Sequence, residues 1–265
     1  MNILEEIIEH KKEEVRRRKS EVSVAELEKR NLFSRPVLSL KDFLLDKSRT
    51  GIIAEFKRRS PSKGKINDTA DVVEVTKGYA GNGASCLSVL TDEYFFGGSD
   101  EDLVKARVNP IPILRKDFII DEYQVIESRS IGADVILLIA GCLSPAGVER
   151  LATFAKGLGL EVLLELHAEE ELDHICDATT VIGINNRNLK TFEVDIERSL
   201  RMAEKIPLPA LKVAESGITS VENILLFKQH GFHGFLIGEN FMKATSPTIA
   251  FAEFVKQLKA KAHED

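Results

Sequence analysis

Several features are scarce or missing in this chain of 265 residues, and each absence excludes a class of protein. Basic residues are outnumbered, because 36 Lys and Arg against 42 Asp and Glu give a formal net charge of −6. General nucleic-acid binding usually shows the opposite balance. No apolar run approaches the ~20 residues that span a membrane, and the acidic, amphipathic residues 1–6 do not resemble a signal peptide. We therefore predict neither a nucleic-acid partner nor a membrane.

Cysteine motifs and metal motifs are also missing. Cys86, Cys142 and Cys176 lie in or near apolar stretches, and none forms a CxxC pair. This usage predicts buried free thiols in a reducing cytoplasm. The chain has no HExxH motif and no cluster of His, Cys and Asp. We expect no metal and no organic cofactor.

What the sequence does contain is a regular alternation of two kinds of segment. Strand-like apolar runs lie near 51–56, 84–90, 111–115, 134–139, 161–166, 180–184, 210–214 and 234–237. Helix-like segments lie near 68–81, 100–107, 121–131, 145–158, 168–175, 195–205, 219–230 and 246–262. Eight such units predict an α/β fold, the (β/α)8 TIM barrel, formed by residues 1–265 as a single domain. A doubly wound sheet is disfavoured because Ser-Pro-Ser replaces GxGxxG after the first strand.

About 45 residues precede the first strand, and we predict an N-terminal helical extension over residues 1–48. Residues 3–19 form an amphipathic pattern whose stripe includes Lys11. A second helix is predicted over 23–30, with Ser23 as its cap and Glu26 three residues later. The basic residues between 11 and 19 alternate with glutamates, so we expect a salt-bridged helix surface there.

Polar residues cluster at the predicted strand ends. Glu55 and Lys57 are two residues apart, so they share one face of a strand that otherwise carries apolar side chains. Lys116, Glu165 and Glu215 end other strands. In a barrel these ends meet at one mouth, where carboxylates and ammonium groups would shift one another's pKa values as acid–base chemistry requires.

Gly217 and Gly238 each follow one of the last two strands. Loops at these positions of a barrel often bind phosphate through backbone N–H groups, so the pair predicts a phosphate site. Ser60 and Ser62 would add hydroxyl donors at the same mouth, although a helix-entry turn fits them almost as well.

Three further features carry less weight. His167 and His174 are interpreted as surface residues at the start of a helix. The aromatic loop 90–99 fits either ordinary packing or an apolar wall for an aromatic substrate. The first helix is expected to cover the barrel mouth and exclude water, the alternative being that it plugs the opposite end.

The motifs together resemble those of the indole-3-glycerol phosphate synthase family of tryptophan biosynthesis. The resemblance rests on four separated segments: residues 53–62 (IAEFKRRSPS), 113–118 (ILRKDF), 183–187 (GINNR) and 214–218 (AESGI). The helical extension before the first strand is another trait of this family. The resemblance implies a cytoplasmic carboxy-lyase that converts 1-(2-carboxyphenylamino)-1-deoxyribulose 5-phosphate to indole-3-glycerol phosphate, carbon dioxide and water.

The resemblance also implies roles for individual residues. Lys116 is expected to be the general acid of ring closure, and Glu165, with Lys57 and Glu55, to serve the dehydration. The remaining site residues are Asn185, which orients a hydroxyl or water, Arg187, which meets an anionic group, Glu215 and Ser216 at the rim, and Ser60, Gly217, Gly238 and Glu239 beside the phosphate. At 239 the family is expected to carry a small residue in some members, so the Glu239 side chain would have to turn away.

Two alternatives stay open at this point. Another sugar-phosphate barrel, such as phosphoribosylanthranilate isomerase or the tryptophan synthase α-subunit, would explain the glycines but not Lys116 or the long extension. A barrel that binds sugar phosphates without catalysis would also fit, but it would be expected to have lost an acid–base residue. We expect a small phosphorylated substrate and no obligate protein partner.

Overall fold

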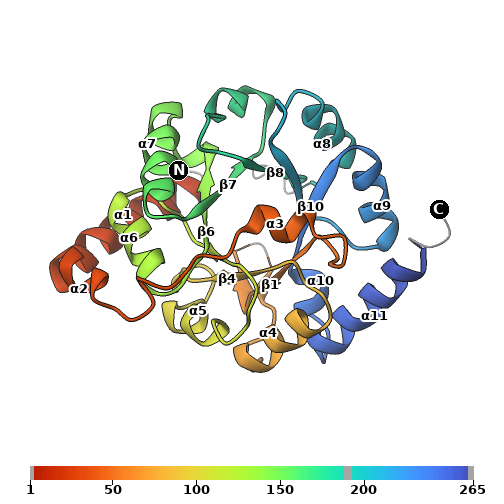
Figure 1. Ribbon diagram of the computed structural model, residues 1–265, viewed down its shortest axis with the longest axis horizontal. Coiled ribbons are helices and arrows are strands. Elements are labelled where there is room, and N and C mark those ends of the chain that lie inside the picture. The colour runs from red at the N-terminus through yellow and green to blue at the C-terminus, as the bar shows by residue number, and fades with distance from the viewer. Residues whose placement is uncertain (1–2, 62, 188–192, 262–265) are drawn as a thin grey trace.

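Eight parallel strands close into a barrel in the computed structural model, which describes residues 3–61, 63–187 and 193–261. In chain order the strands are β1 (Ile52–Phe56), β4 (Cys86–Leu90), β5 (Ile113–Lys116), β6 (Val135–Ile139), β7 (Glu161–Leu166), β8 (Val181–Asn185), β9 (Leu211–Glu215) and β10 (Phe232–Ile237). Each strand pairs with its neighbour in sequence, and β1 pairs with both β4 and β10 to close the ring. The predicted (β/α)8 barrel is confirmed (Figure 1).

Helical segments follow the strands and surround the barrel. They are α4 (Val72–Gly81), α5 (Asp100–Ala106), α6 (Glu122–Ser130), α7 (Pro145–Gly157), η2 (Glu169–His174), α8 (Ile196–Ala203), α9 (Val221–Gln229) and α11 (Pro247–Lys261). The prediction over 168–175 was wrong in type, because η2 is a 3₁₀ helix. The hairpin of β2 (Arg59–Ser60) and β3 (Gly64–Lys65), the turn η1 (Ala140–Cys142) and α10 (Glu239–Met242) were not predicted. All four are too short to produce a periodic pattern.

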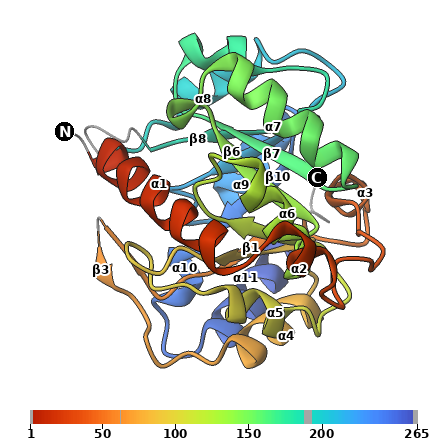
Figure 2. The ribbon, with the colours of Figure 1, turned by 90° about the vertical axis from the view of Figure 1, so that its left-hand side faces the viewer.

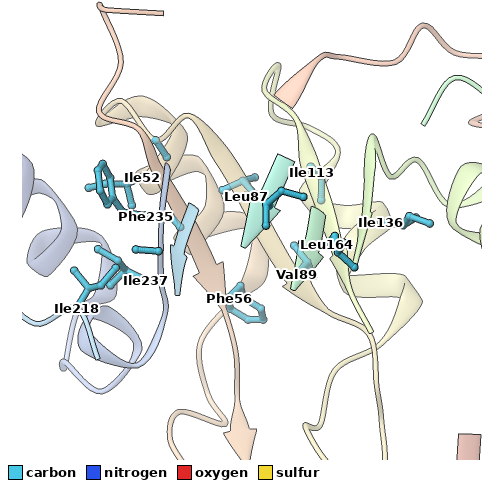
Figure 3. Close-up of a cluster of buried hydrophobic side chains, with 14 of the residues drawn as sticks. Ile52, Phe56, Leu87, Val89, Ile113, Ile136, Leu164, Ile218, Phe235 and Ile237 are labelled. Carbon is cyan, nitrogen blue, oxygen red and sulfur yellow. The ribbon is translucent and has the colours of Figure 1, made fainter. Parts of the chain in front are cut away.

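The strands are buried on both faces, so their alternate residues form two separate apolar layers. The outer layer packs between the strands and the helices, and Figure 3 shows part of it, including Ile52, Leu87 and Ile136. The inner layer fills the barrel with residues such as Ile53 and Leu163. Toward the carboxyl ends of the strands, the same inward positions carry charged side chains. The alternation therefore fixes which residues enter the functional site.

One end of the barrel is closed by α3 (Leu40–Leu45), which lies across it in Figure 1. Leu40 and Leu44 belong to the inner apolar layer and are 0% and 6% exposed. Ser39 caps this helix by accepting a hydrogen bond from the N–H of Asp42. The sequence indicated only a connection here, because six residues are too few to show a helical period.

The first helix, α1 (Ile3–Glu21), lies at the opposite end from α3 and runs down the side of the barrel to α2 (Val24–Glu28), as Figure 2 shows. Its first turns supply Ile3, Leu4 and Ile7 to the cavity at the carboxyl ends of the strands. The predicted position over the mouth is confirmed. The predicted cap of α2 is confirmed too, because Ser23 and Glu26 form a capping box.

The expectation of a salt-bridged surface on α1 was wrong for Lys11 and Arg18. The Lys11 side chain is fully buried, and its Nζ lies 2.9 Å from Asp92 and 3.0 Å from Asp117. Arg18 reaches Asp100 and Glu127 at 2.6 and 2.9 Å. Asp92 follows β4 and Asp117 follows β5, whereas Asp100 begins α5 and Glu127 lies in α6. The basic stripe therefore attaches α1 to the loops after β4 and β5 and to these two helices. Lys12, by contrast, is exposed and pairs with Glu9 as expected.

We predict that Lys11→Met destabilises the protein by about 3–5 kcal/mol, because it removes the cation that pairs with buried Asp92 and leaves buried Asp117 with the Arg115 guanidinium at 3.4 Å. The matched control is Lys12→Met, whose exposed pair contributes about 0–1 kcal/mol. Urea unfolding followed by circular dichroism measures both. Equal losses in the two variants would show that the buried pairs do not hold α1.

Candidate active site

A cavity of about 270 Å³ lies at the carboxyl ends of the strands, beneath α1. The site residues predicted from the sequence that line it are Glu55, Lys57, Ser60, Lys116, Glu165, Asn185, Arg187, Ser216, Gly217, Gly238 and Glu239. Glu215 lies deeper than the rim at which it was predicted, because it is 1% exposed and does not line the cavity. Ser60 lies in β2, so it is not at a helix entry, and Ser62 falls outside the described residues.

Glu55 and Lys57 form an ion pair at the end of β1, with Nζ 2.8 Å from Oε1. Ser88 on the neighbouring β4 donates a hydrogen bond of 3.3 Å to the other carboxylate oxygen. Burial by itself would raise the pKa of Glu55, but the ammonium groups of Lys57 and Lys116 outweigh it and lower that pKa. Glu55 is therefore a buried anion.

Lys116 enters the cavity from β5 and lies 3.5 Å from Oε2 of Glu165 on β7. Burial alone would lower the pKa of Lys116, but the carboxylates of Glu165, Glu55 and Glu215 raise it well above the ordinary value for lysine. Burial would likewise raise the pKa of Glu165, and Lys116 outweighs this so that the pKa is strongly lowered. The amide of Asn185 donates to Oε1 of Glu165 at 2.9 Å. Glu165 is thus held as a carboxylate.

Glu215 on β9 has the opposite electrostatics. Burial and the neighbouring Glu165 carboxylate raise its pKa well above the ordinary value, and Lys116 compensates only in part. Gly183 on β8 makes room for this side chain, because a Cβ at that position would lie 2.0 Å from Glu215 Oε1. Glu215 therefore keeps its proton to higher pH than an ordinary glutamate does, whereas the neighbouring Glu165 loses its proton more readily.

The turn after β9 has an unusual backbone. Ser216 and Gly217 have positive φ angles of 66° and 69°, a region that non-glycine residues rarely adopt. The Ser216 carbonyl accepts a hydrogen bond of 2.7 Å from the side chain of Asn186. Such strain is retained where the surrounding structure imposes it, and it concentrates at binding sites.

Gly238 makes room for another side chain. A Cβ there would lie 2.5 Å from Oε1 of Glu55 and 2.9 Å from its Cβ. Gly238 also caps α10, whose first residue, Glu239, is half-buried at the cavity wall. The glycine that was predicted for phosphate binding is thus also required by the packing of Glu55.

Apolar side chains line part of the cavity. Phe96 and Phe118, with ring centroids 6.0 Å apart, form one apolar wall, and Ile139 of β6 and Leu236 of β10 line the cavity from the strands. Of the aromatic loop, Phe96 reaches the cavity, whereas Tyr94 is exposed and stacks on His10 with centroids 4.5 Å apart. The loop therefore contributes both to the apolar wall of the cavity and to ordinary packing, the two roles that the sequence left open.

The surface position predicted for His167 was wrong. His167 lines the cavity, its side chain is 10% exposed, and its Nε2 lies 2.9 Å from Glu165 Oε1. His174 is half-buried in η2, with its ring nitrogens 3.1 and 2.9 Å from the carbonyls of Glu171 and Leu143. The spacing of Glu165 and His167 was the available signal, because residues two apart at a strand end share a face.

A barrel with its polar cavity at the carboxyl ends of the strands defines a class, the (β/α)8-barrel enzymes. Comparison with known proteins gives the family. A family model described as "Indole-3-glycerol phosphate synthase" matches residues 4–254. The indole-3-glycerol phosphate synthase of Bacteroides thetaiotaomicron is 47% identical over 97% of this chain and 99% of its own length. That of Bordetella pertussis is 43% identical over 96% of this chain and 99% of its own length. The chain belongs to the indole-3-glycerol phosphate synthase family, a family of lyases of tryptophan biosynthesis.

Solved structures show how widely the fold is shared. A chain of the tryptophan synthase α2β2 complex from Pyrococcus furiosus superposes with a TM-score of 0.59 at 14% identity, covering 80% of this chain and 99% of that one. Thiamine phosphate pyrophosphorylase from the same organism gives 0.57 at 15% identity, covering 79% and 95%. At these identities the likeness shows the fold alone. In the described part of the chain, no helix is long and apolar enough to cross a membrane.

The raised pKa of Glu215 leads to a prediction about pH. Its pKa in the folded protein lies above the unfolded value of about 4.3, so the folded protein holds this proton more tightly than the unfolded chain does. The contribution of Glu215 to the free energy of unfolding therefore falls as the pH rises above about 4.3. Relative to the wild type, Glu215→Gln should gain free energy of unfolding between pH 5 and 8, by at most about 1.4 kcal/mol per pH unit. Urea unfolding across this range measures the difference.

The control is Glu149→Gln, which changes an exposed glutamate of α7. It should track the wild type at every pH. If Glu215→Gln does the same, Glu215 is not protonated in the folded protein.

Proposed function

We propose that the protein closes, decarboxylates and dehydrates 1-(2-carboxyphenylamino)-1-deoxyribulose 5-phosphate to indole-3-glycerol phosphate, carbon dioxide and water. Family membership supports the name of the activity. The observation that carries the proposal is the Lys116 ammonium, which lies among the carboxylates of the barrel interior and lines a cavity with one apolar wall. The substrate presents a ketone, an aromatic ring and two anionic groups to such a cavity.

Lys116 is proposed as the general acid of ring closure. As the aromatic carbon attacks the ketone, the ketone oxygen becomes a strongly basic alkoxide. The raised pKa of Lys116 keeps this residue protonated near neutral pH, and an ammonium can protonate an alkoxide even when its own pKa is high. The neighbouring carboxylates thus ensure that the acid is always present in its protonated form.

Glu165, Lys57 and Glu55 are proposed to share the dehydration. Glu165 is a carboxylate fixed by Asn185 and Lys116, so it is suited to take the proton from the carbon next to the nitrogen. Asn185 would then orient the departing hydroxyl or water. The pair of Glu55 and Lys57 supplies a second acid and base within the same cavity. Electrons released with carbon dioxide pass into the iminium formed on ring closure, which requires no cofactor.

The phosphate is proposed to lie between the turn at Ser216 and Gly217 and the start of α10 at Gly238. Ser60, Arg187 and Glu239 line the cavity as well. Backbone N–H groups in glycine turns and at helix starts favour anions. Glu239 would bind the phosphate through its backbone N–H, and its carboxylate would point away from the phosphate. The apolar wall that contains Phe96 would take the aromatic ring, and α1 would exclude water.

The same geometry also fits a barrel that binds sugar phosphates without catalysis, and an activity assay separates the two. We predict that the purified protein, given this substrate in the presence of EDTA, produces indole fluorescence at a rate that saturates with substrate. Binding of substrate without any fluorescence would instead identify a non-catalytic binder. The free thiols Cys86, Cys142 and Cys176 are consistent with action in the cytoplasm.

Replacing the proposed acid tests its role. Lys116→Ala should lower kcat by about 10²–10⁴ while leaving the circular dichroism spectrum unchanged. Lys105→Ala, an exposed lysine of α5 that pairs with Glu101 outside the cavity, is the matched control and should keep the wild-type rate. If Lys116→Ala retained a near wild-type rate, the role of acid would pass to Lys57.

A further inference from the structure

His167 extends the buried charges of the site along β7. It is the second residue after Glu165, so its side chain enters the cavity from the same face. The ring meets Oε1 of Glu165 at 2.9 Å, on the oxygen that also accepts the Asn185 amide, whereas Lys116 lies 3.5 Å from Oε2. His167 thus lies at one carboxylate oxygen of Glu165, and Lys116 lies at the other.

The far side of the imidazole faces a second carboxylate. Nδ1 of His167 lies 3.9 Å from Oε2 of Glu171 in η2. That oxygen is fixed by the backbone N–H groups of His167 and Ala168, at 2.5 and 3.3 Å. The Glu171 side chain is 19% exposed, so it reaches the solvent. A series of Glu165, His167 and Glu171 therefore runs from the barrel interior to the surface.

Both ring nitrogens of His167 are buried, and each faces a carboxylate rather than a backbone carbonyl. His174 is different, because each of its ring nitrogens meets a backbone carbonyl. A histidine held only for packing is usually fixed by such bonds. The ring of His167 instead lies between two carboxylates, an arrangement that stabilises a proton on either nitrogen.

Other titratable groups surround this series. Lys116 approaches from β5 behind Glu165, and Glu215 on β9, whose pKa is raised by burial and by the Glu165 carboxylate, lies beside it. From η1, burial and then the nearby carboxylates of Glu165 and Glu171 raise the pKa of the Cys142 thiol. Among these groups the imidazole is the one with two ring nitrogens, so it can take up a proton at one nitrogen and give up a proton from the other.

The ring closure and dehydration proposed above require such a group, and the role inferred for His167 rests on that proposed function. The ketone oxygen leaves as water and must acquire two protons. One is released when the carbon next to the nitrogen loses its hydrogen. The aromatic carbon loses carbon dioxide rather than a proton, so the second must come from outside the substrate. Each turnover of the carboxylate form therefore consumes one proton from solution.

We propose that His167 stores this proton as an imidazolium and delivers it through Glu165. The Nε2–H bond breaks as an O–H bond forms at Glu165 Oε1, which leaves a neutral imidazole whose Nδ1–H faces Glu171. Glu165 passes the proton on to the departing oxygen and, again a carboxylate, takes the proton from the carbon next to the nitrogen. That proton returns to Lys116, which lies 3.5 Å away and gave up its own proton in ring closure. A proton from solution recharges Nε2 after the product leaves the cavity. His167 acts through Glu165, so it is a positioning and proton-supplying residue.

The decisive variant is His167→Gln, whose amide can still donate to Glu165 but cannot carry a proton. We expect its single-turnover rate to fall on the order of 10²-fold. The decline in wild-type activity at alkaline pH, where the imidazolium is lost, should disappear. Added imidazole should restore the rate in proportion to the concentration of its protonated form. His230→Gln, which removes an exposed histidine after α9, is the matched control and should change nothing.

A purely structural role for His167 would give no rescue by imidazole, and that result would overturn the proposal. An unchanged rate and pH profile would overturn it as well. If His167→Gln fails to fold, Glu171→Gln provides the test, because loss of its carboxylate should move the alkaline decline to lower pH; an unmoved decline counts against the proposal. A wild-type protein inactive on this substrate would refute the proposed function instead.

Discussion

Charge compensation inside the barrel is the constraint on which the site depends. The alternation of strand residues places three carboxylates, Glu55, Glu165 and Glu215, in an interior that is otherwise apolar. A buried carboxylate must be paired with a cation or protonated, because its desolvated charge costs several kcal/mol. Lys57 and Lys116 compensate for two of the three. The pKa of the third, Glu215, is raised by burial and by the Glu165 carboxylate, so it holds its proton to higher pH. The protonation pattern of the site thus follows from five inward-facing positions and the number of cations among them.

Steric room is the second requirement, and glycines provide it. Gly183 leaves the space that Glu215 occupies, and Gly238 does the same for Glu55. A methyl group at Gly238 would push the Glu55 carboxylate away from Lys57, and one at Gly183 would displace the carboxyl group of Glu215. These glycines lie in or directly after a strand, where flexibility is not needed. Their role is to let charged side chains lie inside a barrel whose other inward positions are filled by aliphatic residues.

A separate set of charges holds the N-terminal extension on the barrel. At the mouth, Lys11 joins α1 to Asp92 and Asp117. At the other end, Asp134 binds the Arg35 guanidinium and the N–H of Leu38, which precede α3. Both attachments are buried, so the extension is part of the barrel structure rather than a loose leader. Through Ile3, Leu4 and Ile7 it also contributes to the cavity in which the chemistry is proposed to occur.

The sequence by itself determined the barrel, because eight apolar runs separated by helical periods are a local property that burial imposes along the whole chain. It also determined the convergence of Glu55, Lys57, Lys116, Glu165 and Asn185, since parallel strands end at one mouth. Only the tertiary structure decided the partners of each charge. By their sequence patterns, Lys11 and His167 resemble surface residues. The packing of α1 buries Lys11 beside carboxylates that are distant in sequence. The end of β7 buries His167 beside a carboxylate on the same strand face. Pairing energies depend on distances of a few ångströms between elements, and the folded chain alone sets those distances.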